Sequence, residues 1–265
     1  MDLSTPKIMG ILNVTPDSFY DGGKYQHEKE FLLQAEKMIA EGANFIDVGG
    51  YSSRPGATDI SLAEESRRVL PVVNQLTKIF PEVIVSIDTF RSEVAARAVQ
   101  EGARMINDIS GGQLDERMFE TVAALQVPYV LMHFRGTPQT MTTLSEYENL
   151  TKEMVDYFHQ KIAMLQKFKV KDIVIDPGFG FAKNVTQNFS LLNHLNHFQF
   201  IGKPLLVGLS RKSMIWKTLS TNPEQALNGT TALHTVALLK GASILRVHDV
   251  KEAAETITLI TRLTG

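Results

Sequence analysis

Two aspartates and an asparagine in this chain each stand directly after a short apolar run. They are Asp88, Asn107 and Asp176. Two carboxylates and an amide offer several hydrogen-bond acceptors beside one donor group, which suits a flat heterocycle rich in N–H groups, such as an aminopyrimidinone ring. The aspartates could instead act as a general acid and base, or cap neighbouring helices. Asp176 is the strongest single candidate, because the glycine-rich residues 177–180 predict a sharp bend there.

A second group of polar residues is cationic. Arg54 lies in a glycine-rich segment, and Lys212, Arg246 and His248 follow the last apolar runs. Guanidinium donors and exposed amides that converge at neighbouring strand ends commonly bind phosphate. These residues therefore predict a site for a polyanion.

Asn13 follows the first apolar run and would lie beside the last strand of a closed barrel. Its amide oxygen could help to hold a magnesium ion that the phosphates bring. The sequence has no His-rich or Glu-x-x-His arrangement, so we expect no dedicated protein cage for a metal. As an alternative to anion binding, Arg246 could form structural ion pairs with Asp47 or Asp249.

The elements that must position these residues are short strands alternating with longer helices. Segments of helical period separate the apolar runs and are long enough to return the chain, so the strands should be parallel, with their polar ends on one face. Eight such units predict one (β/α)8 TIM barrel over residues 1–265, with its active site at the C-terminal face of the strands. The runs are residues 7–12, 45–46, 83–87, 105–106, 129–132, 173–175, 205–209 and 244–245.

Capping and periodicity signals predict where several helices begin and end. Apolar residues at spacings of three and four from Leu150 to Leu165 predict one buried stripe. Expected helix starts have a hydroxyl or amide residue near a carboxylate or proline, and expected ends have a left-handed glycine. The starts are Ser61 with Glu64, Ser145 with Glu148, and Asn222 with Pro223; the ends are Gly42, Gly102 and Gly241.

Two segments, residues 15–25 and 49–59, are rich in glycine, proline and polar residues and follow the first and second strands. Loops on the catalytic face of a barrel are where lids are built, and glycine gives them hinge freedom. We expect both to cover the site, with plain surface connection as the alternative.

Composition limits the classes of function. The chain has 265 residues, 43% of them hydrophobic, no cysteine and a formal charge of −2. This charge gives no basic footprint for nucleic acid and no bias toward an acidic membrane surface. The absence of cysteine excludes disulfides and thiolate metal sites. Without a signal peptide or a long apolar stretch, we expect a soluble cytoplasmic protein.

Ordered motifs along essentially the whole chain closely resemble bacterial dihydropteroate synthases, pterin-binding TIM barrels. The first is Ile11-Leu12-Asn13-Val14-Thr15-Pro16-Asp17-Ser18-Phe19 followed by Asp21-Gly22-Gly23, and the second is Ile46-Asp47-Val48-Gly49-Gly50 with Ser53-Arg54-Pro55-Gly56. The match continues through Ser86-Ile87-Asp88-Thr89, Ile106-Asn107-Asp108, Leu131-Met132-His133, residues 176–181, Ser210-Arg211-Lys212-Ser213 and residues 246–250.

The resemblance implies a transferase of folate biosynthesis. Such enzymes join p-aminobenzoate to 7,8-dihydropterin-CH2-pyrophosphate and release pyrophosphate with Mg2+. Carried over by position, Asp88, Asn107, Met132, Asp176 and Lys212 would bind the pterin. Asn13, Arg54, Arg246 and His248 would bind pyrophosphate, with Asn13 also on the magnesium ion. Phe19, Ser53, Pro55, Phe181 and Ser213 would shape the p-aminobenzoate pocket, which sulfonamides mimic; a homodimer is expected as well.

The implied chemistry is a dissociative displacement. Breaking the C–O bond first leaves a cation delocalised into the pterin, which Asp176 would stabilise, while Asp21 and Arg54 would order the two loops and exclude water. Ser53, Tyr20 and Tyr51 depart from the residues common in the family and bear on drug sensitivity more than on activity. Two alternatives are a methyltetrahydrofolate-dependent corrinoid methyltransferase and a catalytically silent pterin-binding barrel.

Overall fold

The computed structural model describes residues 2–14, 24–52, 59–137 and 140–264. Eight parallel strands pair in sequence order, and β8 pairs with β1, so the sheet closes into a barrel. This confirms the predicted (β/α)8 fold. The strands are β1 (Lys7–Asn13), β2 (Phe45–Gly49), β3 (Ile84–Asp88), β4 (Met105–Asp108), β5 (Tyr129–Met132), β6 (Ile173–Asp176), β7 (Leu205–Val207) and β8 (Ala242–Val247).

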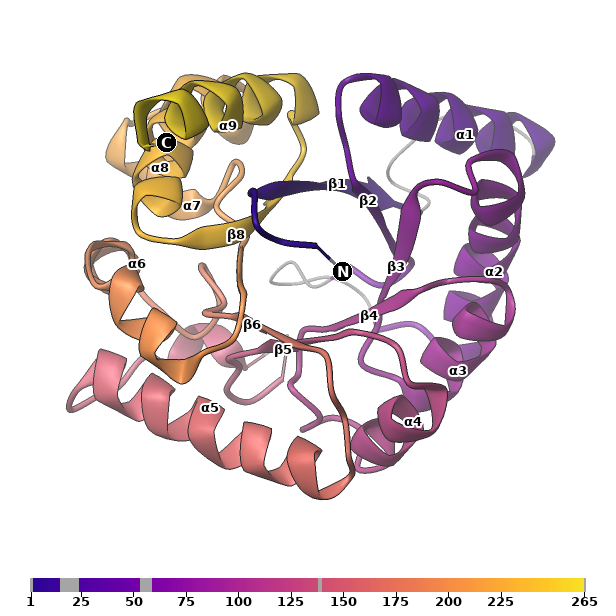
Figure 1. Ribbon diagram of the computed structural model, residues 1–265, viewed down its shortest axis with the longest axis horizontal. Coiled ribbons are helices and arrows are strands. Elements are labelled where there is room, and N and C mark those ends of the chain that lie inside the picture. The colour runs from indigo at the N-terminus through magenta and orange to yellow at the C-terminus, as the bar shows by residue number, and fades with distance from the viewer. Residues whose placement is uncertain (1, 15–23, 53–58, 138–139, 265) are drawn as a thin grey trace.

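Helices surround this ring of strands, as Figure 1 shows. The α-helices are α1 (Lys24–Ala40), α2 (Leu62–Ile79), α3 (Ser92–Gln100), α4 (Met118–Leu125), α5 (Leu150–Lys167), α6 (Val185–Asn193), α7 (Ser213–Thr218), α8 (Leu227–Leu239) and α9 (Val250–Thr264). Short 3-10 helices are η2 (Met141–Thr143), η3 (Leu195–Ile201) and η4 (Pro223–Gln225). None of the helices in the described ranges is long and apolar enough to span a membrane.

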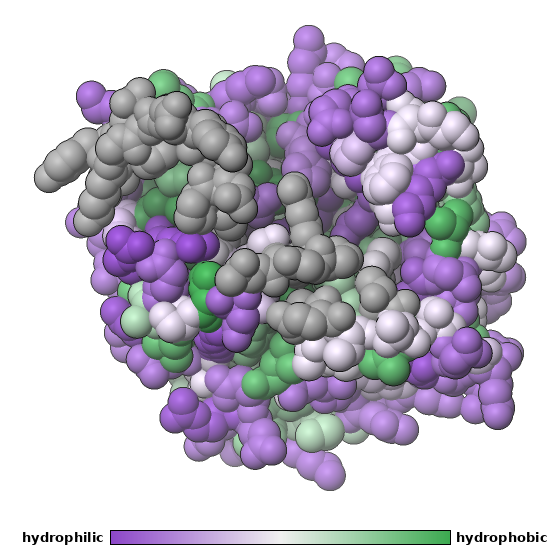
Figure 2. Space-filling view, turned by 180° about the vertical axis from the view of Figure 1, so that it is seen from behind, coloured by the Kyte–Doolittle hydropathy of each residue, from purple (hydrophilic) through white to green (hydrophobic). Residues whose placement is uncertain are grey.

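The core has two main parts on either side of the sheet. The larger part lies between the strands and the helices, where hydrophobic side chains from both layers are buried together. The smaller part fills the inside of the barrel with Met9, Phe45, Met105, Val130, Val174, Leu206 and Ile244, and Leu3 packs against it. The barrel interior is therefore a packed core and not a pore. Seen from the opposite side in Figure 2, the rim of the molecule is mostly hydrophilic.

Strand register brings the predicted polar ends to one level of the ring. Gly49 pairs with Asn13 on one side and with Asp88 on the other, and Asp88 pairs with Asn107. Across the ring, Met132 pairs with Asp176. Because all strands of the barrel are parallel, their C-terminal ends lie at the same end of the barrel. The prediction that the polar strand ends share one face is confirmed.

Helix ends agree with the sequence at most of the predicted positions. Gly42, Gly102 and Gly241 have φ values of +108°, +107° and +93°, a region that favours glycine. At the start of α2, Ser61 Oγ accepts the N–H of Glu64 at 3.1 Å. Asn222 caps a helix start too, although that helix is the short η4.

The predicted helix start at Ser145 is wrong. Helix α5 begins at Leu150, and its cap is Asn149, whose Oδ1 accepts the N–H of Lys152 at 3.0 Å. The segment before it is held against the region that follows β6, because Gln187 Nε2 donates to the carbonyl of Ser145 at 2.7 Å. A tertiary contact thus takes the place of the local capping signal. The stripe from Leu150 to Leu165 is confirmed, and Met154, Phe158, Ile162 and Leu165 are buried.

Candidate active site

A buried network of charged and polar groups joins β2, β3, β4 and β8 at this end of the barrel. Asp47 Oδ2 accepts hydrogen bonds from Asn107 Nδ2 at 2.8 Å and from Arg246 Nε at 2.7 Å. Arg246 Nη2 also donates to Asp88 Oδ2 at 2.6 Å. One guanidinium therefore bridges two carboxylates on neighbouring strands. Of the two ion pairs expected as an alternative for Arg246, the pair with Asp47 is present.

Asp249 has a different partner. Arg211 forms a two-pronged pair with it, at 2.9 Å from Nε and 2.6 Å from Nη2. Near this pair, Ser210 Oγ lies 3.0 Å from Nδ1 of His248, whose side chain reaches the exposed rim. His248 thus lies on the same side of the barrel as Arg246, next along the same strand end, where an anion could meet both.

The carboxylates of Asp88 and Asp176 are largely removed from water. Burial raises the pKa of Asp88 to about 7; Arg246 opposes this rise and the neighbouring Asp47 adds to it. Burial also raises the pKa of Asp176, against the hydrogen bond from Gly178 N to its Oδ1 at 2.7 Å and the nearby Lys212. Both groups are acceptors held in a low-dielectric site, where a hydrogen bond to a ligand is worth more than in water.

Asp108 has a local structural role. Its oxygens accept from Ser110 N at 2.7 Å, Gly112 N at 2.8 Å and Tyr129 OH at 2.7 Å. These contacts fix the turn that follows β4. Asp108 is fully buried and has no oxygen turned to the rim.

Lys212, Phe181 and Gly180 lie together beside Asp176. The Nζ of Lys212 is 4.4 Å from the centre of the Phe181 ring, a cation–π distance. A Cβ on Gly180 would stand 3.2 Å from Cδ of Lys212, so the absence of a side chain there lets the lysine lie across the loop. Lys212 immediately precedes α7, whose first residue is the half-buried Ser213. The predicted pterin and p-aminobenzoate residues of this side thus meet.

Lys183 was not among the predicted site residues. It is only 8% exposed, and its Nζ lies 3.0 Å from the carbonyl oxygens of Gly178 and Phe181 and 3.1 Å from Nδ1 of His133. Burial lowers its pKa to about 7, which the Asp176 carboxylate opposes. The neutral amine can donate to the two carbonyls and accept from the imidazole. Lys183 therefore holds the loop after β6 from inside, and the only signal in the sequence is its place next to the glycine-rich motif.

Asn13 meets the requirements of a magnesium ligand that acts together with a substrate. Within the described residues its side chain takes part in no hydrogen bond, and its Oδ1 lies 3.7 Å from where a Cβ on Gly49 would stand. Within the described residues, no three His, Cys, Asp or Glu side chains are grouped so as to hold a metal. Magnesium commonly keeps several waters and binds through one or two protein oxygens and substrate phosphates. The residues present thus fit an ion that arrives with pyrophosphate.

Five of the predicted site residues lie outside the described ranges. They are Phe19, Asp21, Ser53, Arg54 and Pro55.

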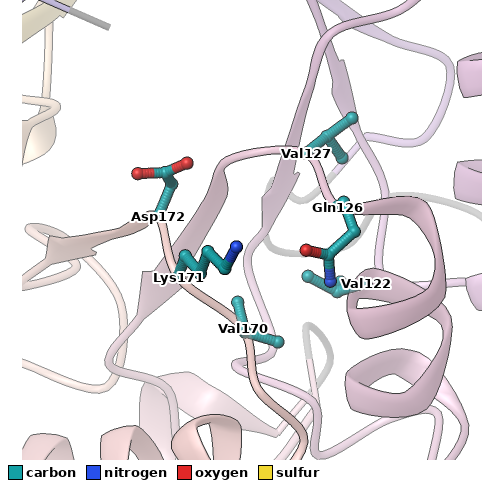
Figure 3. A pocket seen from close by; sticks show the side chains of 6 residues that line it. All are labelled: Val122, Gln126, Val127, Val170, Lys171 and Asp172. Carbon is teal, nitrogen blue, oxygen red and sulfur yellow. The ribbon is translucent and has the colours of Figure 1, made fainter.

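A cavity of about 250 Å³ lies at the opposite end of β5 and β6, lined by Val122, Gln126, Val127, Val170, Lys171 and Asp172 (Figure 3). It has none of the chemistry-bearing residues above, so we place the candidate active site at the strand ends.

Comparisons with known proteins find matches along almost the whole chain. The family described as "Pterin binding enzyme" matches residues 9–248. Dihydropteroate synthase of Escherichia coli (strain K12) is 43% identical over 262 residues, covering 98% of this chain and 92% of the relative. A crystal structure of Yersinia pestis dihydropteroate synthase with a sulfonamide drug complex has a TM-score of 0.93 and 40% identity, covering 99% of this chain and 96% of the other. Dihydropteroate synthase from Xanthomonas albilineans in complex with 7,8-dihydropteroate has a TM-score of 0.90 and 35% identity, covering 100% and 96%.

Proposed function

This chain belongs to the family of pterin binding enzymes, and within it to the dihydropteroate synthases, and from that premise we propose how its residues carry out the reaction. The enzyme is a transferase that joins 7,8-dihydropterin-CH2-pyrophosphate to p-aminobenzoate, giving 7,8-dihydropteroate and pyrophosphate. The observation that carries this function is the gathering of Asp88, Asn107 and Asp176 at one level of the ring, with Lys212 beside them.

In our proposal these four residues, with Met132, bind the pterin. The two carboxylates and the amide accept hydrogen bonds from the ring N–H groups, and the lysine donates to a ring acceptor. Met132 is 2% exposed and pairs in register with Asp176, which supports a place for its thioether against the ring.

Pyrophosphate is bound by Asn13, Arg54, Arg246 and His248 in this proposal. Arg246 supports it because Nε and Nη2 are engaged by carboxylates, while Nη1 makes no hydrogen bond within the described part of the chain. The guanidinium can therefore hold the pterin end of the site and still offer donors to a phosphate. Mg2+ bound with Asn13 would neutralise charge on the leaving group.

The p-aminobenzoate pocket is formed by Phe19, Ser53, Pro55, Phe181 and Ser213. Phe181 and Ser213 are the described members of this set. The assignment is supported by the contact of the Phe181 ring with Lys212 and by the place of Ser213 directly after Lys212 in the chain. The aryl amine would enter next to the reacting carbon of the pterin, and a sulfonamide would occupy the same pocket.

We propose that the displacement is dissociative. The bond between the pterin methylene carbon and the pyrophosphate oxygen breaks first, and its electron pair leaves with the pyrophosphate. The resulting cation is stabilised by the carboxylate of Asp176, which is buried and therefore acts at low dielectric. The neutral amine then attacks the cation and loses a proton. Asp21 and Arg54 would order the two loops that keep water away from the cation.

We also propose that residues 1–265 form one domain and that the protein is cytoplasmic. A homodimer is supported by large apolar side chains that stay exposed on the last two helices, Leu239 on α8 and Leu259 and Leu263 on α9, at 53%, 70% and 73%. The corrinoid methyltransferase and the silent barrel share the pterin residues, and activity separates them from the synthase.

To test the function, the protein is incubated with dihydropterin pyrophosphate, Mg2+ and p-aminobenzoate, and dihydropteroate and pyrophosphate are followed by chromatography. Product should require all three components. Asp176→Asn should lower the rate, whereas Asp156→Asn, which removes an exposed ion pair on α5, should not. Tight pterin binding without product would contradict the synthase and favour one of the two alternatives.

A further inference from the structure

Asp47 is the one member of the buried network that has no role in the proposed reaction. The apolar run before it predicted a strand end at this residue, but β2 continues to Gly49, and Asp47 pairs within the sheet with Ile11 and Ser86. Its side chain is 0% exposed. Asp47 therefore lies one layer below the ligand level, too deep to touch a bound molecule.

Asp47 fixes the orientation of the Asn107 amide. A carboxylate oxygen only accepts hydrogen bonds, so the group of Asn107 that faces Asp47 Oδ2 at 2.8 Å must be the NH2. The carbonyl oxygen of Asn107 is then turned away from Asp47. The part of Asn107 that is left for a ligand at the ring level is thus its carbonyl oxygen, an acceptor.

Asp47 also fixes Asp88, and it does so through Arg246. The planar guanidinium donates Nε to Asp47 and Nη2 to Asp88, so anchoring one edge of the plane sets where the other edge lies. One oxygen of Asp88 is occupied by this bond, and the other stays available as an acceptor. The carboxylate of Asp47 thus controls two of the acceptors that the pterin site presents.

The remaining oxygen of Asp47 suggests why this residue is present. Oδ1 is buried and has no hydrogen-bond partner in the described structure. A buried acceptor without a partner costs free energy, so packing alone would favour an apolar residue here. The arrangement is explained if Oδ2, with its two bonds, serves recognition.

We propose that Asp47 is a positioning residue for pterin binding, which orients the acceptor oxygens of Asn107 and Asp88 without touching the ligand. This inference rests on the proposed function, because it deepens the pterin site. It assigns to Asp47 the selectivity for a ring whose edge carries adjacent N–H donors.

The test is a double-mutant cycle, read as the affinity for dihydropterin pyrophosphate with Mg2+ by calorimetry on the full chain. Asp47→Ala should weaken binding about tenfold or more, as expected for the loss of charge-assisted positioning. Asp47→Asn should recover most of this loss, since its carbonyl oxygen can take the place of Oδ2. In an Asn107→Ala background, Asp47→Ala should reduce the affinity for dihydropterin pyrophosphate by a clearly smaller factor than it does in the parent, because one of the groups that Asp47 positions is gone.

A second measurement separates positioning from a purely structural role. If Asp47 positions the pterin acceptors, the Michaelis constant for p-aminobenzoate at saturating pterin should stay at the parent value in the Asp47 variants. A general loss of structure would instead raise the Michaelis constants of both substrates. Equal pterin affinity of Asp47→Ala and the parent, or full additivity in the cycle, would overturn the inference. If Asp47→Ala does not fold, Asp47→Ser replaces it in the cycle, since its hydroxyl is too short to reach Asn107. Failure of the parent itself to bind pterin would instead count against the proposed function.

Discussion

Gly178 and Gly202 form a matched pair that isolates the effect of a single close approach in the active site. Both have a φ of +69°, so alanine would have to adopt a left-handed backbone at either position. A Cβ at Gly202 would have nothing within 4 Å, whereas a Cβ at Gly178 would stand 2.4 Å from the carbonyl oxygen of His133. The neighbour at Gly178 is backbone and cannot rotate away.

The expected costs follow from these distances. Gly202→Ala should lower the free energy of unfolding by about 1 kcal/mol, the penalty for a left-handed alanine. Gly178→Ala should lower the free energy of unfolding by about 1–3 kcal/mol more than Gly202→Ala does, because its clash forces the backbone to move. Because Gly178 N also donates to Asp176 Oδ1, this movement should weaken pterin binding about tenfold, an effect that Gly202→Ala should not have.

Urea denaturation of the two variants, followed by circular dichroism and by the fluorescence of the single tryptophan, Trp216, measures the difference. Coincident transitions by the two probes would justify a two-state treatment of a chain this long. Pterin affinity is measured by calorimetry on the same samples. Equal destabilisation by the two substitutions, or unchanged pterin affinity in Gly178→Ala, would refute the reasoning.

Three further predictions concern pH, helix capping and the metal. Because the pKa of Lys183 is lowered to about 7, the folded state binds fewer protons than the unfolded state above that pH, so stability should rise by up to about 1.4 kcal/mol per pH unit from pH 7 towards 10. Urea titrations over this range should show that Lys183→Met flattens the rise. Asn149→Ala should cost about 1 kcal/mol of unfolding free energy, and Ser145→Ala close to none, by thermal denaturation. Mg2+ alone should not shift the melting temperature, but Asn13→Ala should raise the Mg2+ concentration needed for half-maximal activity.

The barrel could be predicted from sequence because its signals are repeated and local. Each apolar run ends on a polar residue, and Gly42, Gly102 and Gly241 follow the ends of α1, α3 and α8. A closed parallel ring then leaves one face for Asp88 and Asn107, so the location of the candidate site follows from topology.

What sequence could not provide are contacts between distant segments. A lysine after a loop is usually exposed, and only the fold shows that Lys183 is buried among carbonyls and His133. Sequence offers Arg246 two possible ion-pair partners, Asp47 and Asp249, and only the fold selects Asp47, which lies 199 positions away. The local sequence predicts a helix start at Ser145, but in the structure the carbonyl of Ser145 accepts a hydrogen bond from the distant Gln187 instead. In each case a long-range partner decides the role.

Because Arg246 on β8 bridges Asp47 on β2 and Asp88 on β3, the two early strands depend on the last strand for the arrangement of their carboxylates. Residues of β2, β3 and β4 can fold beside one another early, but Arg246 reaches them only when β8 docks onto β1 and the ring closes. A chain emerging from the ribosome therefore carries the Asp88 carboxylate long before Arg246 can orient it. Recovery of pterin binding during refolding should consequently report the pairing of β8 with β1. A pterin ligand, which binds only the closed barrel, should stabilise this last pairing.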